Sequence, residues 1–258
     1  MHPSPLVSTD LNCDIGEGFG RWRMPADAEL MELVTTVNVA AGFHAGDPST
    51  LRATVDLAAG HGLDIGAHVA LPDLVGFGRR RMEISAQEAY DLALYQIGAV
   101  AGFARAAGTT LTHVKPHGAL YVMASTDRAL AEAIARATAA VGPALRLFLL
   151  DARFAEPVLA AYGVRVEPEG FPDLAYAPDG GLVLERTKEP RPPELVARRA
   201  VRMATGHTVE ATDGSAVPVH ARTLCLHSDA PDAAATARAV REALAAHDVA
   251  VRPLSALG

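Results

Sequence analysis

Cysteines and aromatic residues are scarce in this chain of 258 residues. The two cysteines, Cys13 and Cys225, are too few for a disulfide framework or a multi-cysteine zinc site. A chain so poor in cysteine suits a reducing cytoplasm. Aromatic side chains make up only 5% of the residues, so a stacking platform for single-stranded nucleic acid is not expected.

Positive charge and long apolar runs are also lacking. The 23 lysines and arginines are outnumbered by 30 aspartates and glutamates, for a formal net charge of -7. Such a chain has no electrostatic footprint for nucleic acid or an anionic membrane. The longest apolar stretch, residues 92–104, is too short to span a bilayer, and the N-terminal residues do not resemble a signal peptide. We therefore expect a cytoplasmic protein with neither nucleic acid nor membrane as a partner.

Apolar runs of strand length alternate with helical patterns, which is typical of βα units around a parallel sheet. Half of the residues are hydrophobic, so the core can be large. About seven βα units predict a single α/β domain over residues 1–258 that forms a closed or nearly closed barrel. The strand candidates are residues 6–11, 35–40, 63–70, 111–115, 145–151, 164–170 and 223–228, and a further run at 248–254 could close the set.

Helix signals separate these runs. Asp47 is a candidate N-cap before Pro48 at the first helical position. Ser85 and Glu88 predict a capping box for a helix that ends near Ala107. The remaining predicted elements are helices at 27–34, 129–141 and 232–247 and a β-hairpin insertion near 208–219, where an Asp-Gly turn separates two extended runs.

Polar residues gather at the downstream ends of the apolar runs, where the loops of parallel α/β folds form the ligand crevice. Side chains two residues apart in a strand point the same way. Asp10, Asn12 and Asp14 should therefore project together, as should the alternate residues from His113 to His117. We predict a polar active-site cavity on this rim. Its candidate residues are Asp10, Asn12, Asp14, Asn38, His44, His68, His113, Lys115, His117, Glu167, Glu169, His227 and Asp229.

Three further signals each allow two interpretations. The glycines of GEGFG at residues 16–20 resemble a phosphate-cradling loop, although a tight turn explains them equally well and no GxxxxGK[ST] motif occurs. The three consecutive arginines at 79–81 could bind an anionic substrate or lie solvated. Asp14, His44 and His68 could meet around a divalent metal ion.

Several motifs between Asp10 and Asp229 match those of a known family, in the same order. They include DLNCDIGEGFG, GFHAGDPS, HVKPHGALY, DLAYAPDGGLV and CLHSD. On these motifs the chain resembles the LamB/YcsF proteins, identified as the A subunit of the bacterial ATP-dependent 5-oxoprolinase. Leu174 stands where that family usually has an arginine, which removes one anion contact.

The resemblance implies a distorted β/α barrel related to the glycoside hydrolase/deacetylase barrels. It also implies cleavage of 5-oxoproline (pyroglutamate) to L-glutamate with hydrolysis of ATP to ADP and phosphate, jointly with subunits B and C. The polar motif residues of the family correspond here to Asp10, Asn12, Asp14, Glu17, Asn38, His44, Asp47, His68, Lys115, His117, His227 and Asp229.

Three functions are compatible with these residues. The first is a lactam-opening subunit in which Asp14 and His117 act as acid and base, Lys115 stays protonated and stabilises an oxyanion, the other motif residues bind substrate, and ATP is bound with the partners. The second is a stand-alone metal-dependent amidohydrolase or deacetylase that uses Asp14, His44 and His68 as ligands. The third is a non-catalytic subunit that hands over a small acidic ligand. Each is compatible with a homo-oligomer.

Overall fold

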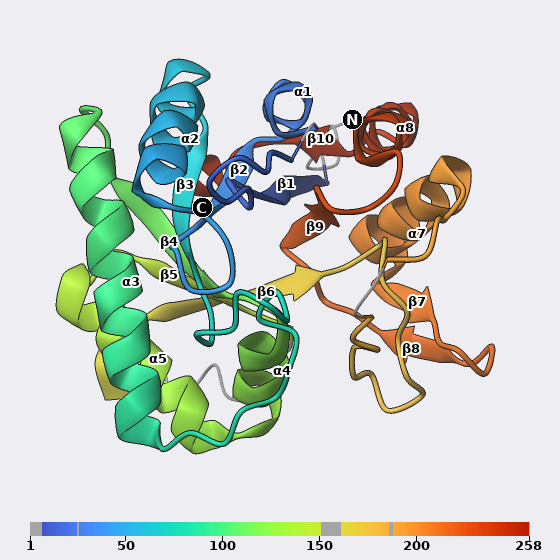
Figure 1. The fold of residues 1–258 in the computed structure, drawn as a ribbon. Coiled ribbons are helices and arrows are strands. Elements are labelled where there is room, and N and C mark those ends of the chain that lie inside the picture. Colours follow the sequence, from blue (N-terminus) through green and yellow to red (C-terminus); the bar gives the residue numbers. More distant parts are fainter. Residues whose placement is uncertain (1–6, 25, 151–160, 186–187, 258) are drawn as a thin grey trace.

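Seven parallel strands close into a barrel in the computed structural model, which describes residues 7–24, 26–150, 161–185 and 188–257 (Figure 1). Each strand pairs with the next along the chain, and the last returns to the first, so the ring has no free edge. The predicted barrel is therefore confirmed. Its strands are β1 (Ser8–Ile15), β2 (Thr36–Ala40), β3 (Asp64–Val69), β4 (Leu111–Pro116), β5 (Arg146–Leu149), β6 (Arg165–Gly170) and β9 (Thr223–His227).

The run at 248–254 does not close this ring. Its strand, β10 (Ala250–Val251), pairs only with the beginning of β1, where Ser8 lies opposite Ala250. The closing contact is instead made by β9, which pairs with β1 from Asp10 to Asp14. Two expected strand ends, residue 6 and residue 151, lie outside the described residues.

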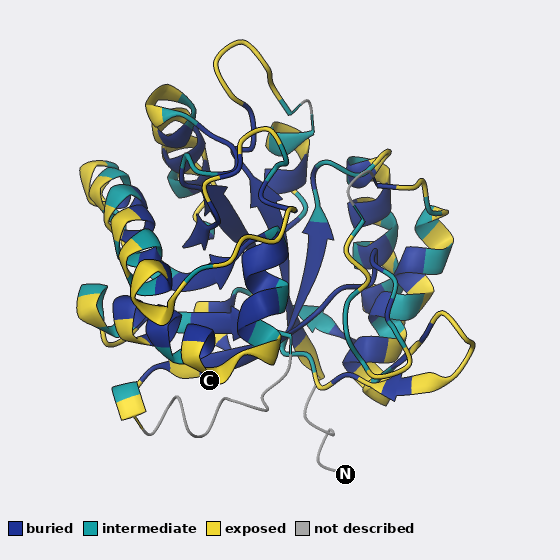
Figure 2. Cartoon of the chain, turned by 60° about the horizontal axis from the view of Figure 1, so that its bottom comes forward, coloured by how far each residue is buried: buried dark blue, intermediate teal, exposed yellow. Residues whose placement is uncertain are grey.

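Helices surround the barrel, with their buried sides turned to the strands and their exposed sides to solvent (Figures 1 and 2). α3 packs against α5 on one side, and α7 packs against α8 on the other. A separate two-stranded antiparallel sheet, β7 (Thr208–Glu210) with β8 (Ala216–Pro218), lies beside α7. The helices are α1 (Asp27–Met31), α2 (Pro48–Gly60), α3 (Ala86–Ala106), α4 (Gly118–Thr126), α5 (Arg128–Val141), α7 (Pro193–Gly206) and α8 (Ala233–Ala246).

Side-chain caps fix the beginnings of α2 and α3 where the sequence predicts them. Asp47 accepts hydrogen bonds from the amides of Ser49 and Thr50. Ser85 and Glu88 form a reciprocal capping box. Each cap satisfies amide groups that the first turn of a helix leaves without partners.

Two helices, α4 and α7, have no counterpart in the sequence prediction. Most residues of α4 are buried, so it shows no apolar stripe against a polar face, and it begins at Gly118 without a side-chain cap. α7 begins at Pro193, the last residue of the proline-rich stretch 190–193, which is locally typical of an extended segment. The first helix, α1, ends at Met31, three residues before its expected end.

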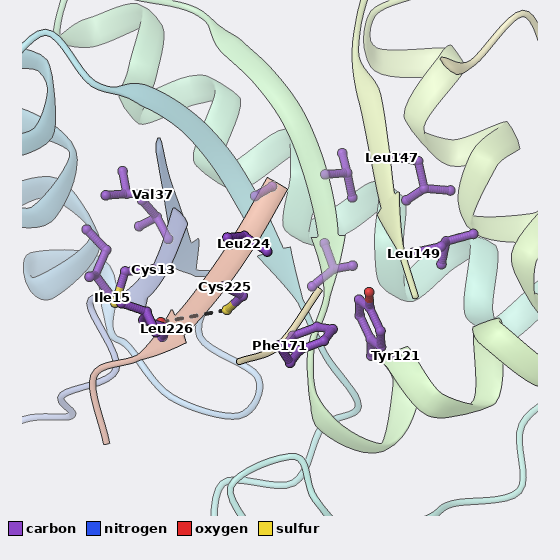
Figure 3. Packing of buried hydrophobic residues seen from close by; sticks show 14 of the residues in the cluster. Cys13, Ile15, Val37, Tyr121, Leu147, Leu149, Phe171, Leu224, Cys225 and Leu226 are labelled. Carbon is purple, nitrogen blue, oxygen red and sulfur yellow. Dashed lines mark hydrogen bonds between the residues drawn. The ribbon is translucent and has the colours of Figure 1, made fainter. Parts of the chain in front are cut away.

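The two faces of the barrel strands differ in chemistry. On β1, Leu11, Cys13 and Ile15 belong to the apolar layer between strands and helices, part of which Figure 3 shows. The alternate residues Asp10, Asn12 and Asp14 are equally buried but make polar contacts across the inside of the barrel. The barrel interior is therefore a polar network, and the candidate site lies where this network reaches the carboxyl ends of the strands.

Candidate active site

A buried lysine lies at the centre of the polar network. The Nζ atom of Lys115, on β4, lies 2.8 Å from Asp14 Oδ1 and 3.0 Å from Glu169 Oε1. It also donates a hydrogen bond to Cys225 Sγ at 2.9 Å. Burial alone lowers the pKa of Lys115, but the neighbouring Asp14, Cys225 and Glu169 raise it well above its usual range. These neighbours therefore favour the protonated form of Lys115.

Asp14 contacts several positively polarised groups at the end of β1. Besides Lys115, Asn38 donates an amide hydrogen bond to Asp14 Oδ1 at 2.9 Å. His68 Nε2 lies 3.3 Å from Asp14 Oδ2. Burial alone raises the pKa of Asp14, but the charges of His68 and Lys115 lower it well below its usual range. Asp14 is thus an ionised carboxylate in an almost fully buried position.

Three histidines and a glutamate form a second cluster beside Asp14, at the ends of β1 to β4. His44 Nε2 lies 2.9 Å from Glu17 Oε1, and His117 Nδ1 lies 2.8 Å from His68 Nε2. The rings of His44 and His117 stack with their centroids 3.8 Å apart. Burial, with the charges of His44 and His68, lowers the pKa of His117 well below its usual range. We call Glu17, His44, His68 and His117 the histidine cluster.

A glycine makes this close packing of histidines feasible. Gly78 lies in the loop after β3 with a φ of +64°. A Cβ at this position would lie 2.7 Å from His117 Cδ2 and 2.8 Å from His44 Cβ. Any larger residue would push the two rings aside, because real Cβ atoms do not approach other heavy atoms so closely.

The third part of the site is His227 paired with an aspartate, Asp173. His227 was predicted from the sequence, and Asp173 was not. The Nδ1–H of His227, at the end of β9, donates to Asp173 Oδ2 at 2.8 Å, and the backbone amide of His227 donates to the same oxygen at 3.0 Å. The other ring nitrogen, Nε2, lies 3.6 Å from Asp14 Oδ2. Burial alone raises the pKa of Asp173, but the charges of His227 and Lys188 lower it well below its usual range.

These groups surround a small cavity at the carboxyl ends of the strands. Asp14, His68, Lys115, His117 and His227 form its polar wall. Its apolar wall comes from Tyr121, Phe171, Leu174 and Leu182, and the Tyr121 and Phe171 rings meet edge to face with centroids 5.3 Å apart (Figure 3). The cavity volume of ≈ 30 Å³ is large enough to hold at least one water molecule.

The other residues expected at the site lie around this cavity rather than in its wall. Asn12 donates a hydrogen bond to Glu169. Asn38 donates to Asn12 and Asp14, and its side-chain oxygen lies within hydrogen-bond distance of His113. Asp229 pairs with Arg79, which lines the cavity, at 2.7 Å. The remaining placements are Asp10 among the threonines of β2 and β9, Asp47 at the α2 cap, Glu17 and His44 in the histidine cluster, and Glu167 among Arg146, Arg165 and Arg222.

Two groups of side chains in the described residues have the spacing of metal ligands. One is the histidine cluster, and the other is Asp14 with Cys225 and His227. The set expected from the sequence, Asp14 with His44 and His68, is not one of them. Asp14 is instead held by Lys115 and Asn38, and Glu17 provides the carboxylate next to His44.

The glycine-rich loop after β1 is not arranged as a phosphate cradle. The amide of Gly16 donates to Asp27 Oδ2 at 2.9 Å, and the amide of Gly20 donates to Asp47 Oδ2 at 3.0 Å. These amides would have to face a phosphate in such a loop. Here they are used by carboxylates of the chain itself, so the tight-turn interpretation holds.

Sequence reasoning overlooked Asp173 and Cys225 for different reasons. Cys225 shares a strand face with Thr223 and His227, so the alternation of β9 contained the signal. Asp173 lies in a turn after β6, where no periodicity applies, and only the folded chain brings it to His227.

Among the described residues, every helix is too short or too polar to span a membrane.

Relatives of this chain carry a common name. A model of the LamB/YcsF family matches residues 9–258. The 5-oxoprolinase A subunit of Methylococcus capsulatus is 50% identical over 254 residues, which cover 96% of this chain and 95% of that protein. The 5-oxoprolinase A subunit of Thermus thermophilus is 47% identical over 248 residues, which cover 95% and 99% of the two chains.

Solved structures extend the comparison to the fold. The crystal structure of a lactam utilization protein from Thermus thermophilus matches with a TM-score of 0.86 and 46% identity, covering 96% of this chain and all of that one. The catalytic domain of a peptidoglycan N-acetylglucosamine deacetylase from Eubacterium rectale matches with a TM-score of 0.53 and 12% identity, covering 100% and 92%. The second match shows a shared barrel fold alone.

Proposed function

The chain belongs to the LamB/YcsF family, and we propose on that basis that it is the lactam-opening subunit of an ATP-dependent 5-oxoprolinase. Its reaction is the cleavage of 5-oxo-L-proline to L-glutamate, coupled to hydrolysis of ATP to ADP and phosphate, jointly with subunits B and C. The observation that carries this proposal is the cavity in which Asp14, Lys115 and His227, the last held by Asp173, face an apolar wall.

The two walls suit the two parts of the substrate. A five-membered lactam ring presents methylene groups that can pack against Tyr121 and Phe171. Its carboxylate needs a cation, and Arg79 and Lys188 line the same cavity.

His227 is the residue best placed to transfer protons. Its Nδ1–H is held by Asp173, so Nε2 can take a proton from water and deliver it to the lactam nitrogen as the ring opens. Asp173 orients the ring and stabilises the charge that develops on it. The sequence favoured His117 for this role, but its Nε2 contacts the carbonyl of Phe77 and its Nδ1 contacts His68.

Asp14 and Lys115 act by their fixed charges. The lowered pKa of Asp14 makes it a weak base, so its role is to hold Lys115 and to stabilise the charged form of His227. Lys115 is protonated and lines the cavity, where it can stabilise the oxyanion that forms at the lactam carbonyl.

ATP is the second substrate, and we place its site on the partner subunits. Opening a stabilised amide at neutral pH is helped by coupling to ATP. The glycine-loop amides of Gly16 and Gly20, which could have bound phosphate, are used within the chain.

The proposal is tested by turnover of the complex assembled with subunits B and C. Asp14→Asn and Asp173→Asn should each lower kcat by at least about 100-fold, the order seen when one preorganised catalytic group is removed. Asp173→Asn should also change the pH dependence of kcat, because an amide no longer holds the His227 tautomer.

The matched control is Asp213→Asn, which changes an aspartate exposed in the turn between β7 and β8 and should leave kcat unchanged. Unaltered kcat in folded Asp14→Asn and Asp173→Asn would refute the assignment of the site.

A further inference from the structure

The histidine cluster has polar contacts that neutral imidazole rings alone cannot satisfy. Its four residues come from the ends of four neighbouring strands, β1 to β4, and all are at least 95% buried. Each offers one ligand atom, and the four atoms lie within 4.8 Å of one another. The cluster lies behind the cavity, and only His68 and His117 reach the cavity wall.

Backbone carbonyls fix the tautomers of two of the three imidazoles. His68 Nδ1 lies 3.1 Å from the carbonyl oxygen of Lys115, and His117 Nε2 lies 2.8 Å from that of Phe77. A carbonyl oxygen only accepts, so each of these nitrogens carries the ring proton. When both rings are neutral, the opposite nitrogens, His68 Nε2 and His117 Nδ1, carry lone pairs and face each other at 2.8 Å, with Asp14 Oδ2 3.3 Å from His68 Nε2.

Two lone pairs at that distance repel unless a proton or a metal ion lies between or beside them. A neutral imidazole whose N–H is held by a backbone carbonyl, with the other nitrogen directed at a common point, is the usual arrangement around a metal ion. His44 adds a third nitrogen. Its Nε2 lies 2.9 Å from Glu17 Oε1, a separation that either a shared proton or a common metal ion accounts for, and its Nδ1 has no hydrogen-bond partner among the described residues.

The spacing of the ligand atoms fits a four-coordinate ion. Ligands about 2.1 Å from a tetrahedral metal ion lie about 3.4 Å from one another. The measured separations lie on both sides of this value. They are 2.8 Å for His117 to His68, 2.9 Å for His44 to Glu17, 3.5 Å for His117 to Glu17 and 3.9 Å for His68 to Glu17.

We propose that Glu17, His44, His68 and His117 bind one divalent first-row transition-metal ion. Three imidazole nitrogens and one carboxylate oxygen suit zinc, cobalt, nickel or iron better than calcium or magnesium, which prefer oxygen ligands. Four buried protein ligands leave no coordination position open, so the ion anchors the strand ends, as structural zinc does. The proposal concerns binding by this chain alone and does not rest on the lactam reaction.

The test is a Co²⁺ titration of the purified chain after dialysis against a chelator, followed by visible absorption and calorimetry. We expect one equivalent to bind, with the visible bands of four-coordinate Co²⁺ and without the near-ultraviolet charge-transfer band of a thiolate ligand. Zn²⁺ should displace Co²⁺ and raise the Tm, because an ion that binds only the folded state stabilises it.

The Co²⁺ affinity of variants tests whether the ion binds at the histidine cluster. Glu17→Gln and His68→Gln should each weaken Co²⁺ binding by more than about 100-fold, beyond the loss typical of an outer hydrogen-bond partner. The control His220→Gln, which alters an exposed histidine near His207, should bind as wild type does. Circular dichroism verifies that each variant is folded.

Three results would overturn the proposal. They are the absence of stoichiometric binding of Co²⁺ and Zn²⁺ by the wild-type chain, unchanged binding by a folded Glu17→Gln, and a thiolate band. The last would place the ion at Asp14, Cys225 and His227 instead. The wild-type spectrum decides the matter even if the cluster variants fail to fold.

Discussion

Charge balance inside the barrel depends on single residues. Lys115 is the buried cation that faces both Asp14 and Glu169. Moving these charges from water into the protein costs free energy, and their mutual attraction offsets that cost only while the set is complete. The sequence indicated that Lys115 faces polar neighbours, because alternation along β4 could be deduced. Glu169 and Cys225 as its direct partners depend on how β9 pairs with β1 and β6, which local sequence does not encode.

Removing Lys115 should therefore destabilise the fold. Lys115→Met should lower the free energy of unfolding by about 3–5 kcal/mol, the cost of leaving a buried charge without its partner. Adding Glu169→Gln should recover part of this loss, because one of the two unpaired carboxylates is then neutral. Urea denaturation measures both values.

The control for this prediction is Arg128→Met, which breaks an exposed pair with Glu132. It should cost at most about 1 kcal/mol. Equal losses for Lys115→Met and Arg128→Met would show that the buried network contributes little.

Asp10 should make stability depend on pH in the opposite sense to a surface carboxylate. Burial raises its pKa from 3.8 to about 6, although hydrogen bonds from Thr223, Thr36 and Thr35 oppose this. The folded state then holds the proton more tightly than the unfolded state. The contribution of Asp10 to stability is fully present below about pH 4 and is lost as the pH rises through about 6.

The variant Asp10→Asn isolates this effect. Relative to wild type, it should gain about 2 kcal/mol of unfolding free energy between pH 4 and pH 7, at up to about 1.4 kcal/mol per pH unit. Urea denaturation of both proteins across this range gives the difference. Stability curves that stay parallel would mean that Asp10 titrates normally.

At the scale of elements, the ends of helices and strands place the side chains of the site. The caps of α2 and α3 follow from local residue patterns, so their starts were predictable. The helix α4 was not, because its burial removes the amphipathic pattern that marks a helix. The loop after β3 carries no periodic pattern at all, although it brings Gly78 against the histidine cluster. Its role becomes visible only when the strand ends are assembled.

The loop after β3 gives an element-scale prediction. Gly78→Ala should destabilise the protein by about 1–3 kcal/mol more than Gly62→Ala, because its methyl group would clash with His117 and His44. Gly62 has a similar φ of +67° but nothing within 4 Å of an added Cβ, so it reports the backbone cost alone. Thermal unfolding measures both. The same loss at the two positions would show that the histidine cluster tolerates displacement.

At the scale of the whole molecule, parallel pairing gathers the carboxyl ends of seven strands into one polar rim. The alternation of runs and helices predicted this architecture because each βα unit is a local pattern. Which strand closes the ring could not be predicted from local sequence. β9 closes the ring through contacts with β1 more than two hundred residues away, whereas β10 only extends β1 at its other end. The Asp173–His227 pair depends on that closure.

The most direct test of the central claim is glutamate release from 5-oxo-L-proline, measured with this chain, with subunits B and C, and with all three together, each with and without ATP. The account predicts release only when all three proteins and ATP are present, with ADP formed alongside. Full activity of subunits B and C without this chain would contradict it. So would robust release by this chain alone without ATP, which would identify a stand-alone hydrolase instead.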